Sequence, residues 1–313
     1  MAKFTDRVAE ANVVLDTAST ATGAAGGDHA ALHDRTIGDI LAELRHLSAE
    51  QVEKVLAHQR AKGLRFGEAA VALGLASKGD VLFALAQQFH YPYAPDEHGK
   101  LKGDLVALNE PFSARAEGFR ALRSQLMMRL FGAADPSQPG GLALAIISPD
   151  SGDGKTYTAT NLAVTLAQLG GRTLLVDADM RNPQVHEVFS LDNKSGLSGI
   201  LSGRADRQVI QQVAAIPSLF VLPVGITPPN PQELVERPAF GLLMRELVGK
   251  FDHVLVDTPA AVHGADAAVI AAKCGAALLL VRKDASRSDA LRELVASLAG
   301  APVKMAGVVF NEF

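Results

Sequence analysis

Residues 142–156 read LALAIISPDSGDGKT and join an apolar run to a glycine-bearing loop. The run over 142–147 is continuous, as expected of a strand that is buried on both faces of a sheet. Residues 156–169 then have the composition of a helix, which is expected to end at the pair Gly170-Gly171. A strand, a glycine loop and a helix in this order predict a phosphate-binding unit.

Apolar runs alternate with helical segments over the rest of the C-terminal region. Asn230, Pro231 and Glu233 give one of these helices a favourable start. The alternation predicts an α/β fold, with a mostly parallel sheet that is covered by helices on both sides. The further strands are predicted at residues 172–177, 218–224, 253–257, 276–282 and 303–310.

Three aspartates lie at the ends of predicted strands. Asp177 and Asp179 come at the end of one strand, and Asp257 ends another. The carboxyl ends of parallel strands lie at one edge of a sheet, where such folds bind their ligands. We therefore expect these carboxylates beside the glycine loop, residues 148–156, in a single nucleotide site.

The glycine loop has the residues needed to bind ATP through its phosphates. The backbone N–H groups of four loop residues are expected to point at phosphate oxygens, with the positive end of the following helix behind them. These residues are Ser151, Gly152, Asp153 and Gly154. Lys155 is expected to bridge the β- and γ-phosphates.

The remaining polar residues predict a magnesium ion and a phosphoryl-transfer step. Mg2+ prefers hard oxygen ligands and usually keeps several waters. The Thr156 hydroxyl and Asp257 are the expected ligands, with Asp179 as a further candidate. One of Asp177 and Asp179 is left to orient or deprotonate the attacking group, and the sequence does not separate those two roles.

The loop departs from the usual Gly-x4-Gly-Lys-Ser/Thr pattern, because Pro149 stands where the first glycine belongs. A simple glycine turn, with aspartates that cap helices, is the alternative interpretation. All three elements fall at strand ends, and this coincidence favours the nucleotide site.

The motifs SPDSGDGKT, LLVDADMRNP and FDHVLVDTPA resemble those of the bacterial tyrosine kinases of polysaccharide synthesis and export, of the EpsG chain-length-determinant type. The resemblance covers residues 112–313 and includes GLSGILSGRAD at 196–206 and PNPQELVERPAF at 229–240. It implies a P-loop fold like that of the MinD and ParA ATPases, with ATP and Mg2+ as cofactors. It also implies regulation of exopolysaccharide chain length or export, with a membrane-spanning co-polymerase as the partner whose cytoplasmic tail switches activity.

Three further features supply candidate site residues, and the first two take their role from this resemblance. Glu117, Arg120 and Arg123 match the Glu-x-x-Arg-x-x-Arg helix through which these kinases form rings, although a solvated face with internal ion pairs explains the spacing too. Asn311 matches the position where relatives read adenine, with a turn asparagine as the alternative. Tyr157 starts the helix behind the phosphates and is counted among the nucleotide-contacting residues, with simple packing as its alternative role.

Members of that family usually phosphorylate a tyrosine cluster in a C-terminal tail. This sequence has three tyrosines, Tyr91, Tyr93 and Tyr157, and we expect no such cluster in it. Two other functions stay open, namely an ATPase switch of the MinD class and a regulatory module that responds to cyclic di-GMP. The loop lacks the extra lysine that MinD-type proteins carry before Gly154, which disfavours the first of these.

A small all-helical module is predicted upstream of the kinase-like domain. The module contains two copies of one pattern, which align residues 36–59 with residues 65–88. Ser48 and Ser77 are natural N-caps for the second helix of each copy. The predicted divisions are disorder over 1–32, the module over 33–95, a linker over 96–111 and the kinase-like domain over 112–313.

The repeated pattern resembles the N-terminal domain of type II secretion and pilus assembly ATPases, some of which bind cyclic di-GMP. Over residues 35–90, the second copy keeps Arg65, Gly67 and Gln88, whereas the first copy has Thr36 where the arginine belongs. Cyclic di-GMP is therefore a candidate ligand of this module, with protein docking as the alternative.

Composition excludes some classes of function. The net charge of −4 gives no overall attraction to nucleic acid, and a single cysteine excludes an internal disulfide. No stretch reaches the ~18–20 apolar residues that a membrane-spanning helix needs. We therefore expect a cytoplasmic protein, and the resemblance to the bacterial tyrosine kinases implies a homo-oligomer that is held at the inner membrane through its partner.

Overall fold

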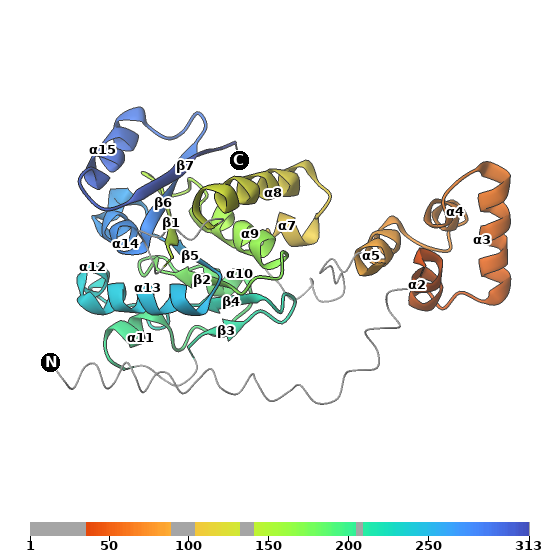
Figure 1. Ribbon diagram of the computed structural model, residues 1–313, viewed down its shortest axis with the longest axis horizontal. Coiled ribbons are helices and arrows are strands. Elements are labelled where there is room, and N and C mark those ends of the chain that lie inside the picture. Colours follow the sequence, from red (N-terminus) through yellow and green to blue (C-terminus); the bar gives the residue numbers. More distant parts are fainter. Residues whose placement is uncertain (1–35, 89–103, 132–140, 205–208, 313) are drawn as a thin grey trace. The chain divides into compact units, whose positions relative to one another are not determined.

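The computed structural model describes residues 36–88, 104–131, 141–204 and 209–312. The chain divides into two compact units, Met1–Glu97 and His98–Phe313, which are described separately below (Figure 1). The segment with predicted disorder, residues 1–32, lies outside the described residues, as do Tyr91 and Tyr93.

Residues 36–88, the described part of the first unit, form four helices with a small core between them. They are α2 (Ile37–Leu44), α3 (Ala49–Lys62), α4 (Phe66–Ala72) and α5 (Lys78–Gln88). Ser48 caps α3 as predicted, because its hydroxyl accepts from the backbone of Gln51 while the Gln51 side chain accepts from the backbone of Ser48. Ser77 and Asp80 make the same reciprocal pair at α5. Each copy of the repeat therefore forms a short helix followed by a longer one.

The second unit is built on a seven-stranded sheet with the order β3-β4-β2-β5-β1-β6-β7, and the predicted α/β fold is confirmed. Every neighbouring pair of strands is parallel except β3 with β4. The strands are β1 (Ala143–Ile147), β2 (Thr173–Asp177), β3 (Gln211–Gln212), β4 (Leu219–Leu222), β5 (His253–Asp257), β6 (Gly275–Arg282) and β7 (Lys304–Asn311). The sequence did not predict β3, because two polar residues at a sheet edge carry no apolar alternation.

Helices cover both faces of this sheet (Figure 1). The side chains of Leu144 and Ile146 enter one core, and those of Ala145 and Ile147 enter the other. This double burial explains why residues 142–147 are apolar without a break. One face carries α7 (Val106–Asn109), α8 (Ala114–Leu126) and α9 (Lys155–Ala167), and the other carries α13 (Pro238–Lys250), α14 (Asp266–Cys274) and α15 (Ser288–Leu298). Shorter helices are η4 (Met127–Phe131), α10 (Val185–Val188), α11 (Leu197–Leu201), α12 (Pro231–Glu236) and η5 (Ala261–His263).

The linker prediction over 96–111 is wrong for residues 104–111, which belong to the second unit. Helix α7 is buried there and is fastened to α9 by the side chains of Asn161 and Gln168, of which Gln168 donates to the carbonyl of Ala107. The Asn161 amide oxygen accepts from the backbone of Ala107 at 2.9 Å, and its nitrogen donates to the carbonyl of Asp104 at 3.0 Å. The apolar residues 105–108 form a run of only four positions, which is too short to predict a core helix from the sequence.

Among the described residues, no helix has both the length and the hydropathy to cross a membrane.

Candidate nucleotide-binding site

The loop between β1 and α9 has a backbone that only glycine adopts easily at two positions. Gly152 and Gly154 have φ angles of 83° and 93°, in the left-handed region. A Cβ atom at Gly154 would also collide with the side-chain nitrogen of Asn311. The loop therefore turns tightly at the carboxyl end of β1, and α9 begins at Lys155.

Side chains hold this loop in place from both sides. The buried carboxylate of Asp153 accepts from the backbone of Asp150 at 2.9 Å and from the Ser286 hydroxyl at 2.8 Å. The Asn311 amide donates to the carbonyl of Asp153 at 2.9 Å, which ties the end of β7 to the loop. The side chain of Asp153 thus holds the loop in shape. Its backbone N–H is the group that could donate a hydrogen bond to a phosphate oxygen.

Lys155 lies against the start of the loop. Its side-chain nitrogen donates to the Ser148 hydroxyl at 3.0 Å, and the residue is 7% exposed. Burial lowers the pKa of Lys155, and the nearby carboxylates, Asp257 first among them, act in the opposite direction. A buried ammonium group is thus placed behind the loop, where it can bind phosphate oxygens.

Thr156, in the first turn of α9, meets Asp257 at the end of β5. The Thr156 hydroxyl donates to Oδ2 of Asp257 at 2.6 Å, whereas the buried Oδ1 of Asp257 has no hydrogen-bond partner among the described residues. Burial raises the pKa of Asp257 to about 7, although the Thr156 hydrogen bond and Lys155 lower it. An orphaned carboxylate oxygen beside a hydroxyl fits a Mg2+ ion that has few protein ligands and keeps its waters. No cluster of three or more His, Cys, Asp or Glu side chains that could hold a metal occurs in the described part of the chain.

The two aspartates at the end of β2, Asp177 and Asp179, differ in burial. Asp177 is fully buried and accepts from the backbones of Asp179 and Val185, and burial together with Asp257 raises its pKa well above the usual range. Asp179 is partly exposed, and its Oδ1 accepts from the backbones of Arg181 and Asn182. Of the two, Asp179 is the carboxylate that a ligand can reach.

Sequence reasoning did not single out His263 or Arg181. His263 lies within hydrogen-bonding distance of Ser151, with 2.8 Å between Nε2 and Oγ, so it connects η5 with the glycine loop. Arg181 donates from Nε to the buried carboxylate of Asp266 at 2.6 Å and so joins the β2 loop to α14. The Arg in DADMR was visible in the sequence, but its partner 85 positions away was not.

Tyr157 contributes little to this site through its side chain. Its ring packs edge-on against Phe119 of α8, with 5.6 Å between ring centroids, and burial raises the pKa of its hydroxyl. The structure therefore favours the packing role over contact with the nucleotide.

The three predicted oligomer residues on α8 make different contacts. Glu117 and Arg120 form an ion pair at 2.7 Å, with Glu117 69% exposed. Arg123 instead donates to the carbonyl of Thr165 at 2.8 Å, which attaches α8 to α9. Arg123 thus has a structural contact within the chain in addition to any role between chains.

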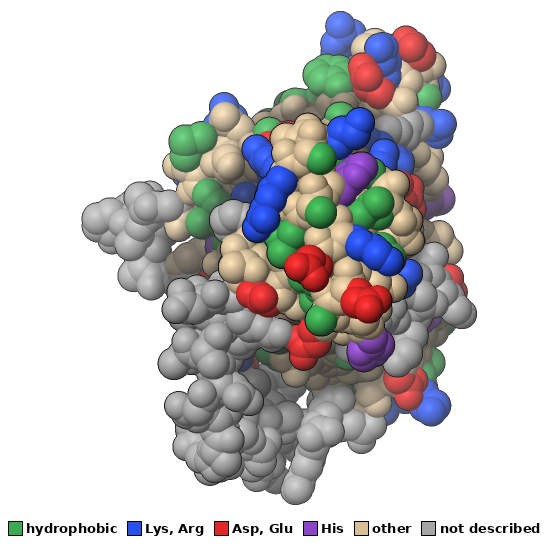
Figure 2. Space-filling view, turned by 90° about the vertical axis from the view of Figure 1, so that its right-hand side faces the viewer, with side chains coloured by type: hydrophobic (Ala, Val, Ile, Leu, Met, Phe, Trp, Pro, Cys, Tyr) green, Lys and Arg blue, Asp and Glu red, His purple; other side chains and the backbone are tan. Residues whose placement is uncertain are grey.

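The candidate cyclic di-GMP residues of the helical unit also have structural roles. A Cβ atom on Gly67 would lie 2.7 Å from a methyl group of Val81, so α4 and α5 can pack closely only with glycine there. The backbone N–H of Arg65 donates to the Glu68 carboxylate at the start of α4. Figure 2 shows charged side chains of both signs on the face of this unit that is turned to the viewer. Close packing alone explains Gly67.

The glycine loop, its lysine and two strand-end carboxylates now lie together at one sheet edge. Residues 144–313 match the CobQ/CobB/MinD/ParA nucleotide-binding domain family. The tyrosine-protein kinase YwqD of Bacillus subtilis is 31% identical over 212 residues, which cover 68% of this chain and 87% of YwqD. The chain belongs to the bacterial tyrosine kinases within that nucleotide-binding family.

Solved structures of bacterial tyrosine kinases have the same fold. The kinase domain of Escherichia coli tyrosine kinase ETK is similar with a TM-score of 0.61 and 30% sequence identity. The match covers 66% of this chain and 79% of the ETK chain. The chimerical protein CapA2B2 has a TM-score of 0.60 at 33% identity, over 67% of this chain and 89% of that chain. The Ralstonia solanacearum relative EpsB, named as a tyrosine-protein kinase, is 35% identical, but the match spans only 27% of its length.

Proposed function

We propose that this bacterial tyrosine kinase family member is an active ATP-dependent protein-tyrosine kinase that regulates exopolysaccharide chain length or export. The observation that carries the proposal is the pairing of Thr156 with Asp257 beside the buried Lys155. This arrangement offers a cation for phosphate oxygens and an orphaned carboxylate oxygen for a metal.

Each side chain then has a defined task. The backbone N–H groups of residues 151–154 and the N-terminus of α9 bind the phosphates, and Lys155 moves from Ser148 to the β- and γ-phosphate oxygens. Thr156 and Asp257 would hold Mg2+, which when bound neutralises charge on the phosphates. Asp179 orients the acceptor hydroxyl or accepts its proton, because it is partly exposed whereas Asp177 is buried.

We also propose the setting in which this site works. The unit assembles into a homo-oligomer through Glu117 and Arg120, which form an exposed ion pair on α8. A membrane-spanning polysaccharide co-polymerase holds the oligomer at the inner membrane and switches its activity through a cytoplasmic tail. Asn311, already hydrogen-bonded to the loop, would lie at the adenine end of the nucleotide.

Incubation with γ-labelled ATP, with and without the cytoplasmic tail of the partner, tests the proposed function. Label on protein tyrosine is the predicted result. Release of free phosphate alone would show an ATPase switch, and nucleotide binding without turnover would show a regulatory binder. Either of these two results would contradict the kinase assignment.

A further inference from the structure

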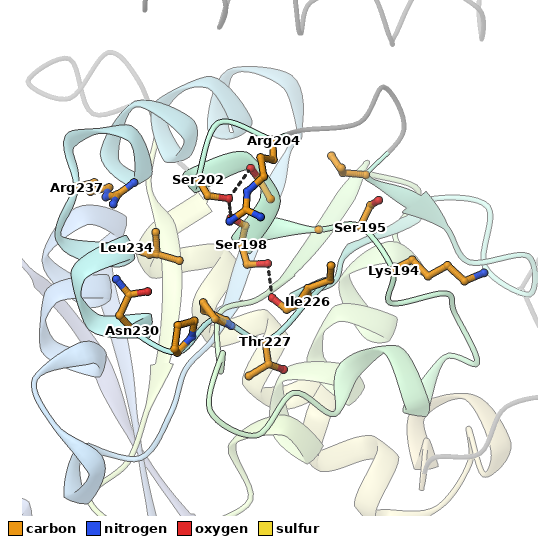
Figure 3. A pocket seen from close by; sticks show the side chains of 15 residues that line it. Lys194, Ser195, Ser198, Ser202, Arg204, Ile226, Thr227, Asn230, Leu234 and Arg237 are labelled. Atoms are coloured by element: carbon orange, nitrogen blue, oxygen red, sulfur yellow. Dashed lines mark hydrogen bonds between the residues drawn. The ribbon is translucent and has the colours of Figure 1, made fainter.

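A pocket of about 590 Å³ opens beside the nucleotide site and has no role in the function proposed above (Figure 3). Its walls come from α11 and the segment before it, and from residues 226–237 with α12. Because β4 ends at Leu222, just before this second wall, the pocket lies at the same sheet edge as the nucleotide site.

The floor of this pocket is a close crossing of two backbones. Leu197 donates to the carbonyl of Pro223 at 2.8 Å, and Ser198 donates to that of Val224 at 2.9 Å. A Cβ atom on Gly196 would collide with the Pro223 carbonyl, so only glycine allows this approach. The Ser198 hydroxyl adds a 2.6 Å bond to the carbonyl of Ile226 (Figure 3). The shape of the pocket is therefore fixed by hydrogen bonds to backbone groups on both of its walls.

The other wall is fixed by a lysine from α14. Lys273 donates to three successive carbonyls at the end of α12, those of Val235, Glu236 and Arg237, at 2.6–2.8 Å. The ammonium group of Lys273 thus supplies a donor to the carbonyl groups that the short helix α12 leaves unpaired at its C-terminus, just before α13 begins at Pro238. It thereby sets the direction of the chain at Arg237.

The charged side chains that line the pocket, among the residues that the structure describes, are all cations. Lys194, Arg204 and Arg237 line it, and none of the described residues that line it carries a carboxylate. Lys194 is paired with Asp192 at 3.2 Å, and Figure 3 shows its side chain extending away from the other lining residues. Within the described part of the chain, no carboxylate forms a salt bridge with Arg204 or Arg237. Both side chains are exposed, and one nitrogen of Arg237 donates to the carbonyl of Leu201 at 3.4 Å.

Apolar side chains lie between these cations. Val209, Ile226 and Leu234 contribute to the lining, together with Pro228 and Pro229. A ligand that fits this combination has carboxylates for the two arginines and a large apolar or aromatic group for the surface between them.

Helix α12, which lines the pocket, also approaches the loop after β2. Arg181 of that loop is paired with Asp266, and the charges of Asp179 and Glu233 act on it as well. A Cβ atom on Gly264 would lie 3.4 Å from Arg181 and 3.5 Å from Gln232, so the β2 loop, the segment after β5 and α12 converge here. A peptide that extends from Asp179 along this edge would reach the pocket next.

We propose that this pocket binds an acidic, tyrosine-bearing segment of the protein that the kinase phosphorylates, with Arg204 and Arg237 as the residues that recognise its carboxylates. The inference rests on the proposed kinase function. It adds the chemical class of the acceptor and the place where the segment beside the tyrosine binds.

Fluorescence anisotropy of labelled poly(Glu,Tyr) with the full chain and no ATP tests the pocket. We expect saturable binding that weakens with added salt, and at least a tenfold weaker affinity for Arg204→Ala/Arg237→Ala. The matched control is Arg245→Ala/Arg292→Ala, which removes two exposed arginines that do not line the pocket and should stay within twofold of the wild type. Equal affinity of the first variant and the wild type would overturn the inference, as would the absence of binding to the wild type.

Two further readouts separate this inference from the kinase assignment. With ATP present, Arg204→Ala/Arg237→Ala should raise the KM for poly(Glu,Tyr) at least tenfold and leave kcat within threefold. If the wild type binds the copolymer through both arginines but never phosphorylates it, the kinase assignment fails and the acidic-peptide pocket stands. If the variant instead changes only self-association, measured by light scattering, the pocket binds a second copy and the inference fails.

Discussion

The hydroxyl of Thr156 and the carboxylate of Asp257 are 2.6 Å apart, although 101 positions of sequence separate them. This hydrogen bond joins the first turn of α9 to the end of β5, and it leaves Oδ1 of Asp257 buried without a partner among the described residues. The two residues thus share one hydrogen bond and leave a buried acceptor oxygen, which a bound cation would satisfy.

Asp257→Asn should weaken the binding of ADP with Mg2+ at least tenfold, because the amide is a poorer ligand for a hard cation. Binding of ADP in EDTA should change less than twofold, since Lys155 and the loop remain intact. Isothermal titration with and without Mg2+ measures both affinities. Asp289→Asn on α15 is the matched control, because this carboxylate is exposed. An equal loss with and without Mg2+ would argue against a metal role for Asp257.

Asn161→Ala should destabilise the second unit by about 2–4 kcal/mol, since buried backbone groups lose their partners. The Asn161 side chain bonds to Ala107 and Asp104 near α7 and to the carbonyl of Tyr157 within α9. Urea unfolding followed by circular dichroism gives the free energy. Gln125→Ala on the exposed side of α8 should change it by less than about 0.5 kcal/mol. A loss below that size at Asn161 would mean that α7 is not fastened as described.

The buried His253 should make stability depend on pH. Burial lowers its pKa from the usual 6.5, with Asp252 acting in the opposite direction, and its ring lies against Phe131 and Thr173. The unfolded chain then binds a proton more readily than the folded one, so the free energy of unfolding falls as pH drops from above 6.5 to below it. Asp177 and Asp257 titrate as well, so the test compares the wild type with His253→Gln at pH 7.5 and pH 5.5. The advantage of the wild type should shrink at the lower pH, and a constant or growing advantage would contradict the assignment.

The residues on α8 should separate assembly from stability. Glu117→Ala/Arg120→Ala should shift the molar mass measured by light scattering toward the monomer without lowering the melting temperature, because the pair is local. Arg123→Ala should cost about 1 kcal/mol of stability as well, since it loses the bond to Thr165. An unchanged mass for the double variant would contradict the oligomer role.

The sequence was sufficient where local pattern determines structure. The apolar run at 142–147 predicted β1, and the residue types at 154–156 predicted the nucleotide loop. The rule that parallel strands end at one sheet edge also predicted that Asp257 lies beside the loop, but two other long-range contacts were not predictable. The pairing of Asp153 with Ser286 spans 133 positions, and that of Asn311 with the loop spans 158. Neither contact has a periodicity or spacing that a single sequence can reveal.

Phosphoamino acid analysis of poly(Glu,Tyr) after incubation with γ-labelled ATP and Mg2+ is the most direct test of the kinase assignment. Wild-type protein should produce phosphotyrosine, and Lys155→Met should produce none, because it removes the cation behind the loop. Lys62→Met, at the exposed end of α3, should match the wild type. Phosphotyrosine formed equally by Lys155→Met, or free phosphate as the sole product of the wild type, would contradict the account.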